Sequence, residues 1–123
     1  MLILCASDAG PAKYLSILAA NLSIPHTTFA SAVSEPIFEA DNITTNTFNP
    51  SLIDSTVRCA VLGTTLGASI EKDIIELAKI YLFPCVSIID HWTNYLARFQ
   101  IRGLHQFPDE IFVNDETAKI QAY

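Results

Sequence analysis

The feature that most constrains the fold is a short apolar run at residues 85–89 that leads directly into a dense polar and aromatic cluster. A β-rich run of this length behind Pro84 is typical of a parallel strand covered by helices on both faces. The cluster Asp-His-Trp-Thr-Asn at 90–94 then falls where this strand leaves the sheet. Because ligands of open α/β sheets bind outside the carboxyl ends of the strands, this cluster is the first candidate site.

Similar apolar runs recur along the chain, and helical spacing follows most of them. Further strands are predicted at 2–6, 26–31, 57–62 and 110–113, with a poor edge strand at 44–47. Helices are predicted at 11–22, 35–39, 70–81 and 117–122. This alternation predicts one α/β domain over residues 1–123, a Rossmann-like, doubly wound three-layer sandwich. Right-handed crossovers predict a parallel sheet in the order 3-2-1-4-5-6.

The composition fits a helix-covered sheet. Of the 123 residues, 50% are hydrophobic and 16% are charged, which is apolar for a globular protein of this length. No run approaches the ~18 apolar residues of a membrane span, and the first residues lack the basic start of a signal peptide. We therefore expect a cytoplasmic protein without a membrane span.

The charge balance argues against a nucleic-acid partner. Seven Lys and Arg against thirteen Asp and Glu give a net charge of −6, whereas a phosphate backbone requires a basic stripe. The three cysteines, Cys5, Cys59 and Cys85, lie far apart inside apolar runs. They lack the close pairing of a zinc site, so we interpret them as core residues and predict no metal and no cofactor.

Two of the turns after predicted strands are candidate anion sites. Asp8 and Gly10 follow the first strand, where Gly10 can take the cap position of the next helix and Pro11 its first turn. An ordinary strand-to-helix turn explains these residues equally well. Thr64 and Thr65 lie between glycines in a loop that opens the helix at 70–81, and such a loop can cradle a phosphate or carboxylate. The alternative is that these residues only cap the helix.

Asp90 and His91 are the predicted catalytic residues. Neighbouring residues of an extended backbone point in opposite directions, so these two cannot form a dyad with each other. An acid from another strand end, Asp8, Asp115 or Glu116, would then orient His91. We expect His91 to be partly exposed, with its pKa raised by these acids, because a nearby negative charge favours the protonated ring.

Residues that follow His91 add candidate contacts to a ligand. Trp92 and Tyr95 offer flat faces that stack on sugar rings or bases, and Arg98 lies near Asn94 at helical spacing. The alternative for Trp92, Tyr95 and Phe99 is that they pack as core beneath a loop.

Four segments together resemble the amino-terminal half of a family of bacterial surface-carbohydrate biosynthesis proteins. They are ASDAGPA at 6–12, LGTTLGASIEK at 62–72, SIIDHWTNYLARF at 87–99 and PDEIFVNDE at 108–116. That family is similar to GT-B glycosyltransferases and UDP-N-acetylglucosamine 2-epimerases. The resemblance implies a Rossmann-like domain that faces a second domain across a cleft, with a sugar or nucleotide sugar bound between them. The substrate-binding candidates are Asp8, Gly10, Thr64, Thr65, Trp92, Asn94, Arg98, Asp115 and Glu116.

The chain departs from this family in length. In such proteins a second Rossmann-like domain supplies most nucleotide-sugar contacts, whereas this sequence ends at Tyr123. We therefore expect a carbohydrate-biosynthesis domain, glycosyltransferase-like or epimerase-like, that needs a second half for catalysis. The alternative is a non-catalytic binding module of the same fold. A homo-oligomer, formed through an apolar face, or a missing carboxyl-terminal half would complete it.

Overall fold

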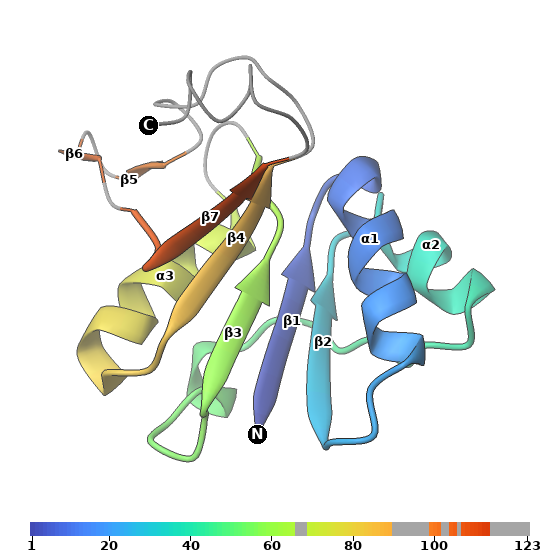
Figure 1. Ribbon diagram of the computed structural model, residues 1–123, viewed down its shortest axis with the longest axis horizontal. Helices are drawn as coiled ribbons and strands as arrows, with labels where there is room; N and C mark the ends of the chain where they lie inside the picture. The colour runs from blue at the N-terminus through green and yellow to red at the C-terminus, as the bar shows by residue number, and fades with distance from the viewer. Residues whose placement is uncertain (66–68, 90–98, 102–103, 106, 114–123) are drawn as a thin grey trace.

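A computed structural model of the chain describes residues 1–65, 69–89, 99–101, 104–105 and 107–113. Five parallel strands form the sheet in Figure 1: β1 (Leu2–Ala6), β2 (His26–Ala30), β3 (Cys59–Leu62), β4 (Cys85–Ile89) and β7 (Glu110–Val113). The helices are α1 (Ala9–Ala20), α2 (Glu35–Ala40), α3 (Ile70–Tyr81) and a 3-10 turn, η1 (Pro50–Leu52). A separate antiparallel hairpin pairs β5 (Gln100–Ile101) with β6 (Leu104–His105).

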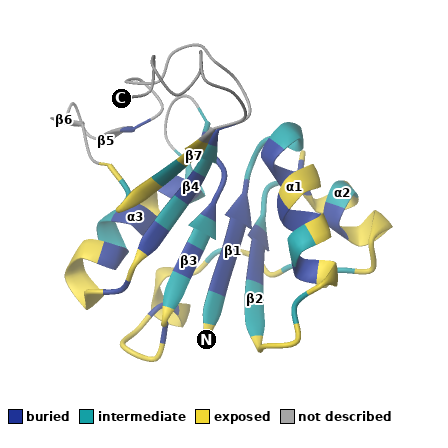
Figure 2. Ribbon diagram, in the orientation of Figure 1, coloured by how far each residue is buried: buried dark blue, intermediate teal, exposed yellow. Residues whose placement is uncertain are grey.

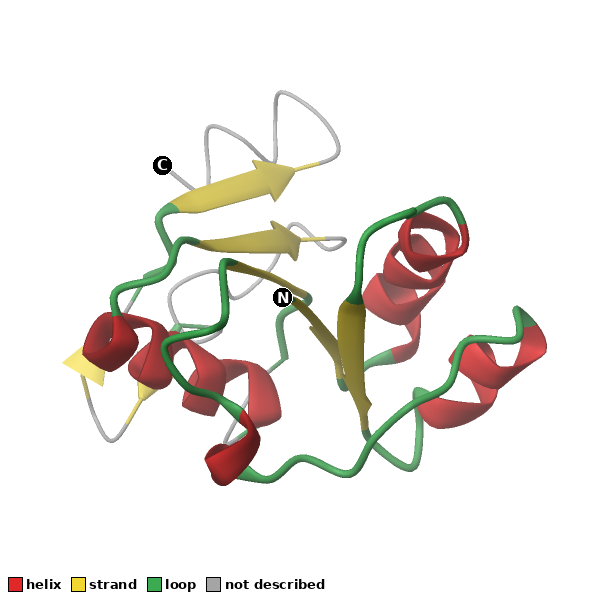
Figure 3. Cartoon of the chain, turned by 90° about the horizontal axis from the view of Figure 1, so that it is seen from below, coloured by secondary structure: helices red, strands yellow, loops and turns green. Residues whose placement is uncertain are grey.

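The prediction of a parallel α/β sheet is confirmed, and its layers are consistent with a Rossmann-like fold. β1 is completely buried from Ile3 to Ala6, and Figure 2 shows this part of the strand in dark blue. Ile3 and Cys5 join the hydrophobic cluster beneath α3, while Ala6 joins the cluster beneath α1 and α2. Helices therefore cover both faces of the sheet, as Figure 3 shows.

The predicted order of six strands, 3-2-1-4-5-6, is wrong. The sheet has five strands in the order β2-β1-β3-β4-β7, and the expected strand at 44–47 contributes only one parallel bridge, from Asn46 to Phe29. The reason is that this segment passes around the edge of the sheet beside β2. Ile43 packs in the cluster under α1 and α2, whereas Phe48 packs in the cluster on the α3 face. Only Asn46 lies in the plane of the sheet, where its N–H donates to the Thr28 carbonyl at 2.8 Å.

Helix α3 occupies the range predicted from its apolar spacing, and its ends follow from local chemistry. The Ser69 hydroxyl accepts a hydrogen bond from the Lys72 N–H at 3.3 Å, which caps the amino terminus. The carboxyl terminus closes at Leu82, which adopts the left-handed conformation with φ 60°. Among the described residues, no helix has both the length and the apolar character needed to cross a bilayer.

Gly63 marks the closest approach between the sheet and α1. Its N–H donates to the Cys5 carbonyl at 2.8 Å, which continues the pairing of β3 with β1 past the last strand residue. A Cβ at this position would lie 2.4 Å from the Cβ of Pro11 and 3.0 Å from its Cγ. Only glycine therefore lets the first turn of α1 rest on the end of β3.

We predict that Gly63→Ala lowers the free energy of unfolding by about 1–3 kcal/mol, the usual cost of forcing an extra methyl group into a packed contact. Chemical denaturation measures this loss. The double variant Pro11→Gly with Gly63→Ala removes the opposing Cβ, so its loss should be smaller than the sum of the two single losses. A Gly63→Ala protein as stable as the wild type would contradict this account of the contact.

Candidate functional site

The candidate site lies where the chain leaves the carboxyl ends of β1 and β3. From β1 the chain turns into α1 on one face of the sheet, and from β3 it leads to α3 on the opposite face (Figure 1). Ligands of doubly wound sheets bind at such a topological switch point, in the crevice outside the strand ends. The residues of this edge are therefore the ones to examine for chemistry.

The buried carboxylate of Glu71 joins the start of α3 to the end of β1 through hydrogen bonds. Glu71 lies in the first turn of α3 and is only 2% exposed. Its carboxylate accepts hydrogen bonds from the Ser7 N–H at 3.2 Å and from the Ser7 hydroxyl, and the Cys5 thiol donates to it at 3.9 Å. The start of α3 is thus fixed to the end of β1, just as the start of α1 is fixed to the end of β3 by the contact of Pro11 with Gly63.

Ser7 is also held from the side of β2. The hydroxyl of Ser31, the residue after β2, donates to the Ser7 carbonyl at 2.6 Å. The same Ser31 oxygen accepts from the N–H groups of Val33 and Ser34, each at 3.2 Å. Side-chain hydrogen bonds therefore join the end of β1 both to the end of β2 and to α3, so the backbone at Ser7 has a fixed position on this edge.

Burial controls the electrostatics of this network. It raises the pKa of Glu71 above its ordinary value of 4.5; the hydrogen bonds from Ser7 act in the opposite direction, and the nearby charge of Asp8 adds to the increase. Burial, with the charge of Glu71, also raises the pKa of the Cys5 thiol well above its ordinary value. Cys5 therefore remains a protonated core thiol, as its apolar sequence context predicts.

Lys72, the next residue of α3, is also buried and is 4% exposed. Burial lowers the pKa of its ammonium group, while the neighbouring charge of Glu71 opposes that decrease. The first turn of α3 thus carries an acid and a base that have both been removed from water.

The structure brings together four of the predicted site residues at this edge. Asp8 is half-buried and caps α1, its carbonyl accepting from the Ala12 N–H at 3.2 Å, while its side chain makes no capping hydrogen bond. Thr64 is buried and Thr65 is half-buried, and both follow Gly63 at the end of β3. The expectation that Gly10 takes the cap position is wrong. Asp8 has an extended backbone and is itself the cap residue. The helix therefore begins at Ala9, and Gly10 lies within its first turn.

The other predicted site residues lie outside the described part of the chain, and their roles stay predictions. They are Asp90, His91, Trp92, Asn94, Arg98, Asp115 and Glu116. Asp90 directly follows Ile89, the last residue of β4, in the sequence.

The sequence analysis missed Ser7 and Glu71. In the sequence, Glu71 fits an acid that complements the helix dipole at the start of the helix at 70–81. A more informative signal was present in its spacing, since Glu71, Ile74, Ile75 and Ala78 follow the i, i+3, i+4, i+7 pattern of a buried stripe. An acid within such a stripe requires buried hydrogen-bond donors, and Ser7 supplies them.

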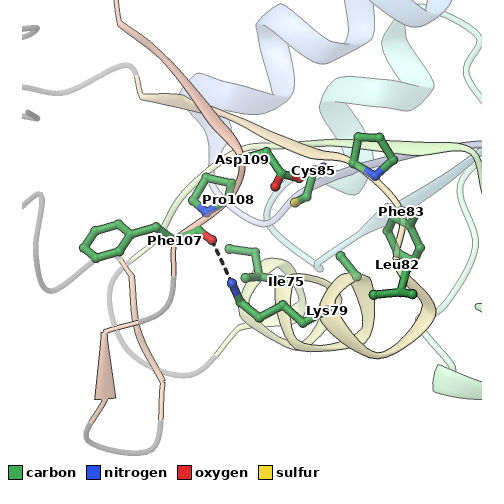
Figure 4. A pocket seen from close by; sticks show the side chains of 10 residues that line it. Ile75, Lys79, Leu82, Phe83, Cys85, Phe107, Pro108 and Asp109 are labelled. Carbon is green, nitrogen blue, oxygen red and sulfur yellow. Dashed lines mark hydrogen bonds between the residues drawn. The ribbon is translucent and has the colours of Figure 1, made fainter.

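A hollow lies at the opposite edge of the sheet. It has a volume of about 490 Å³ and lies between the end of α3 and the amino ends of β4 and β7 (Figure 4). None of the residues that line this hollow belongs to the candidate site at the carboxyl edge. Among the described residues, no cluster of three or more His, Cys, Asp or Glu side chains could hold a metal ion.

Comparisons of the chain with protein-family models, with curated proteins and with solved structures found no match. The residues themselves therefore carry any functional argument.

We predict that Glu71→Gln changes how stability depends on pH. A carboxyl group whose pKa is raised by folding favours the native state when protonated, so its contribution falls as the pH rises from about 4.5 through the folded-state pKa. Glutamine keeps the shape and an acceptor oxygen but does not titrate. The wild type should therefore lose stability relative to Glu71→Gln as the pH rises from acidic to neutral. The difference in thermal midpoint, Glu71→Gln minus wild type, should increase over this range.

The matched control is Glu110→Gln, at an exposed position of β7, whose midpoint should run parallel to that of the wild type. Parallel curves for Glu71→Gln as well would show that this carboxyl group titrates alike in the folded and unfolded chains.

Proposed function

We propose that this chain is a carbohydrate-biosynthesis domain that binds a sugar or nucleotide sugar at the carboxyl edge between β1 and β3. Glycosyl transfer or epimerisation then requires a second half, from a further domain or a partner. The observation that carries the proposal is the Ser7–Glu71 network, because it fixes the backbone at the switch point, where doubly wound folds bind ligands.

The electrostatics of this edge favour an anionic group such as a diphosphate. α1 and α3 both begin here, and the first turn of each contacts the strand end that precedes the other. The amino terminus of a helix carries partial positive charge and unpaired backbone N–H groups. Two helix termini at one crevice therefore offset the negative charge of Asp8 and provide a setting in which a phosphorylated sugar is stabilised.

Glu71 acts in this proposal as a positioning residue. The residue is 2% exposed and its carboxylate already accepts hydrogen bonds from Ser7, so it does not contact a ligand. Its role is to hold Ser7 and the adjacent Asp8 in place. The sequence-based prediction assigns the reacting groups to His91 and Asp90, after β4.

The second candidate is a binding module of Rossmann-like fold without catalysis. The burial of Glu71 favours this candidate, since this acid, whose pKa is raised, is withdrawn from any ligand. Ligand binding without any transfer or epimerisation would support it.

Isothermal titration with UDP-sugars and with free nucleotides tests the proposal. We expect the wild-type chain to bind, and Thr65→Ala to weaken binding about tenfold or more, equivalent to roughly 1.4 kcal/mol. Lys13→Ala, at an exposed position of α1, is the matched control and should bind as the wild type does. Absence of binding by the wild-type chain to every nucleotide and nucleotide sugar would refute a self-sufficient site at this edge.

The His91→Ala variant tests the sequence-based assignment separately. We expect its thermal midpoint to stay nearly unchanged while ligand binding is lost, because a residue that contacts the ligand contributes little to the core. A large loss of stability with binding retained would instead identify His91 as a structural histidine.

A further inference from the structure

The hollow at the amino edge of the sheet has an apolar floor. The side chains of Ile75, Ala78 and Phe83 line it beneath the end of α3, and Phe107 and Pro108 line its opposite side (Figure 4). Cys85 lies within the lining, and burial raises the pKa of its thiol to about 12, so this sulfur adds apolar surface rather than a reactive group. The hollow therefore suits an apolar side chain.

Leu82 stands on the rim of this hollow as an exposed apolar projection. Its side chain is 87% exposed, and its backbone has φ 60°, a conformation that disfavours residues with a Cβ. Ile80 and Tyr81 beside it are 68% and 42% exposed, and Phe107 across the hollow is 41% exposed. Exposed apolar side chains such as Leu82 and Phe107 on the rim of an apolar hollow are typical of an interaction site.

Two opposite charges occupy the same rim, and hydrogen bonds hold both in place. The Lys79 ammonium donates to the Phe107 carbonyl at 3.2 Å, as Figure 4 shows. A carboxylate oxygen of Asp109 accepts from the Cys85 N–H at 2.8 Å. One small surface thus combines an apolar projection, an apolar hollow, a positive charge and a negative charge.

We propose that this surface is the interface of a homodimer with two-fold symmetry. In such an interface the same patch meets itself, so each contact occurs twice. Leu82 of each copy enters the hollow of the other, and Lys79 of each copy faces the partner's Asp109. A second copy is the occupant that uses all of these features at once, because it supplies a projection for the hollow and complementary charges for both rim groups.

This arrangement leaves the candidate ligand site accessible. The interface involves the amino ends of β4 and β7, whereas the Ser7–Glu71 network lies at the carboxyl end of β1. This dimer interface therefore lies on the edge opposite the candidate ligand site, so the dimer does not supply the second half that catalysis requires. The dimer proposal does not depend on the proposed function and fails or succeeds independently.

Sedimentation equilibrium across micromolar concentrations tests the proposal. We expect the wild-type chain to approach twice its 13.5 kDa mass as its concentration rises. Leu82→Gly should raise the dimer dissociation constant at least tenfold while leaving the fold intact, because glycine adopts the left-handed conformation readily and lacks the projecting side chain. The control is Ile17→Ala, which removes an exposed apolar side chain from α1, away from the hollow. Ile17 is 62% exposed, and this variant should dimerise as the wild type does.

Two charge-removing variants test the pairing across the interface. Lys79→Gln and Asp109→Asn keep a donor toward the Phe107 carbonyl and an acceptor toward the Cys85 N–H, so the fold should persist. Each should raise the dissociation constant severalfold. A wild-type chain that is monomeric at every concentration would overturn the proposal, even if its hollow binds an apolar dye. A dimer whose dissociation constant Leu82→Gly leaves unchanged would overturn it as well.

Discussion

The burial of β1 on both faces is the constraint on which the rest of the structure depends. Four consecutive residues, Ile3 to Ala6, have no exposed surface, so apolar elements must cover both sides of the sheet at its centre. The chain meets this requirement by sending α1 to one face and α3 to the other. The switch point between β1 and β3 is the direct geometric consequence, and it places polar loop residues where the two directions diverge.

Glu71 joins helix α3, which covers one face of the sheet, to the polar edge at Ser7. An ionised carboxylate deprived of water is costly, and hydrogen bonds from Ser7 recover only part of that free energy, since the net pKa of Glu71 is raised. The acid is nonetheless retained within an otherwise apolar helical stripe. Its contribution is to define one position for Ser7, which the hydroxyl of Ser31 reinforces from the side of β2. A rigid edge of this kind is what a ligand site at the switch point requires.

Patterns that repeat along the chain were predictable from the sequence, and features that depend on three-dimensional proximity were not. The apolar runs of β1 and β4 and the apolar spacing of α3 gave correct elements, because burial on a strand or a helix imposes a period on the sequence. Residues 41–56 pass around the sheet edge because Ile43 packs on the α1 face of the sheet and Phe48 packs on the α3 face. No local sequence pattern predicts this packing. Likewise Ser7 and Glu71 are 64 positions apart, and only the fold reveals that they form one network.

We propose that ligands bind at the carboxyl edge and that the hollow at the amino edge forms the dimer interface. Titration of the isotopically labelled chain with a UDP-sugar, followed by amide NMR shifts, tests this most directly. We expect the shifts of Ser7, Asp8, Gly63 and Thr64 to change, while those of Lys79, Leu82 and Asp109 stay constant. Changes confined to the residues around the amino-edge hollow, or no changes at all, would contradict it.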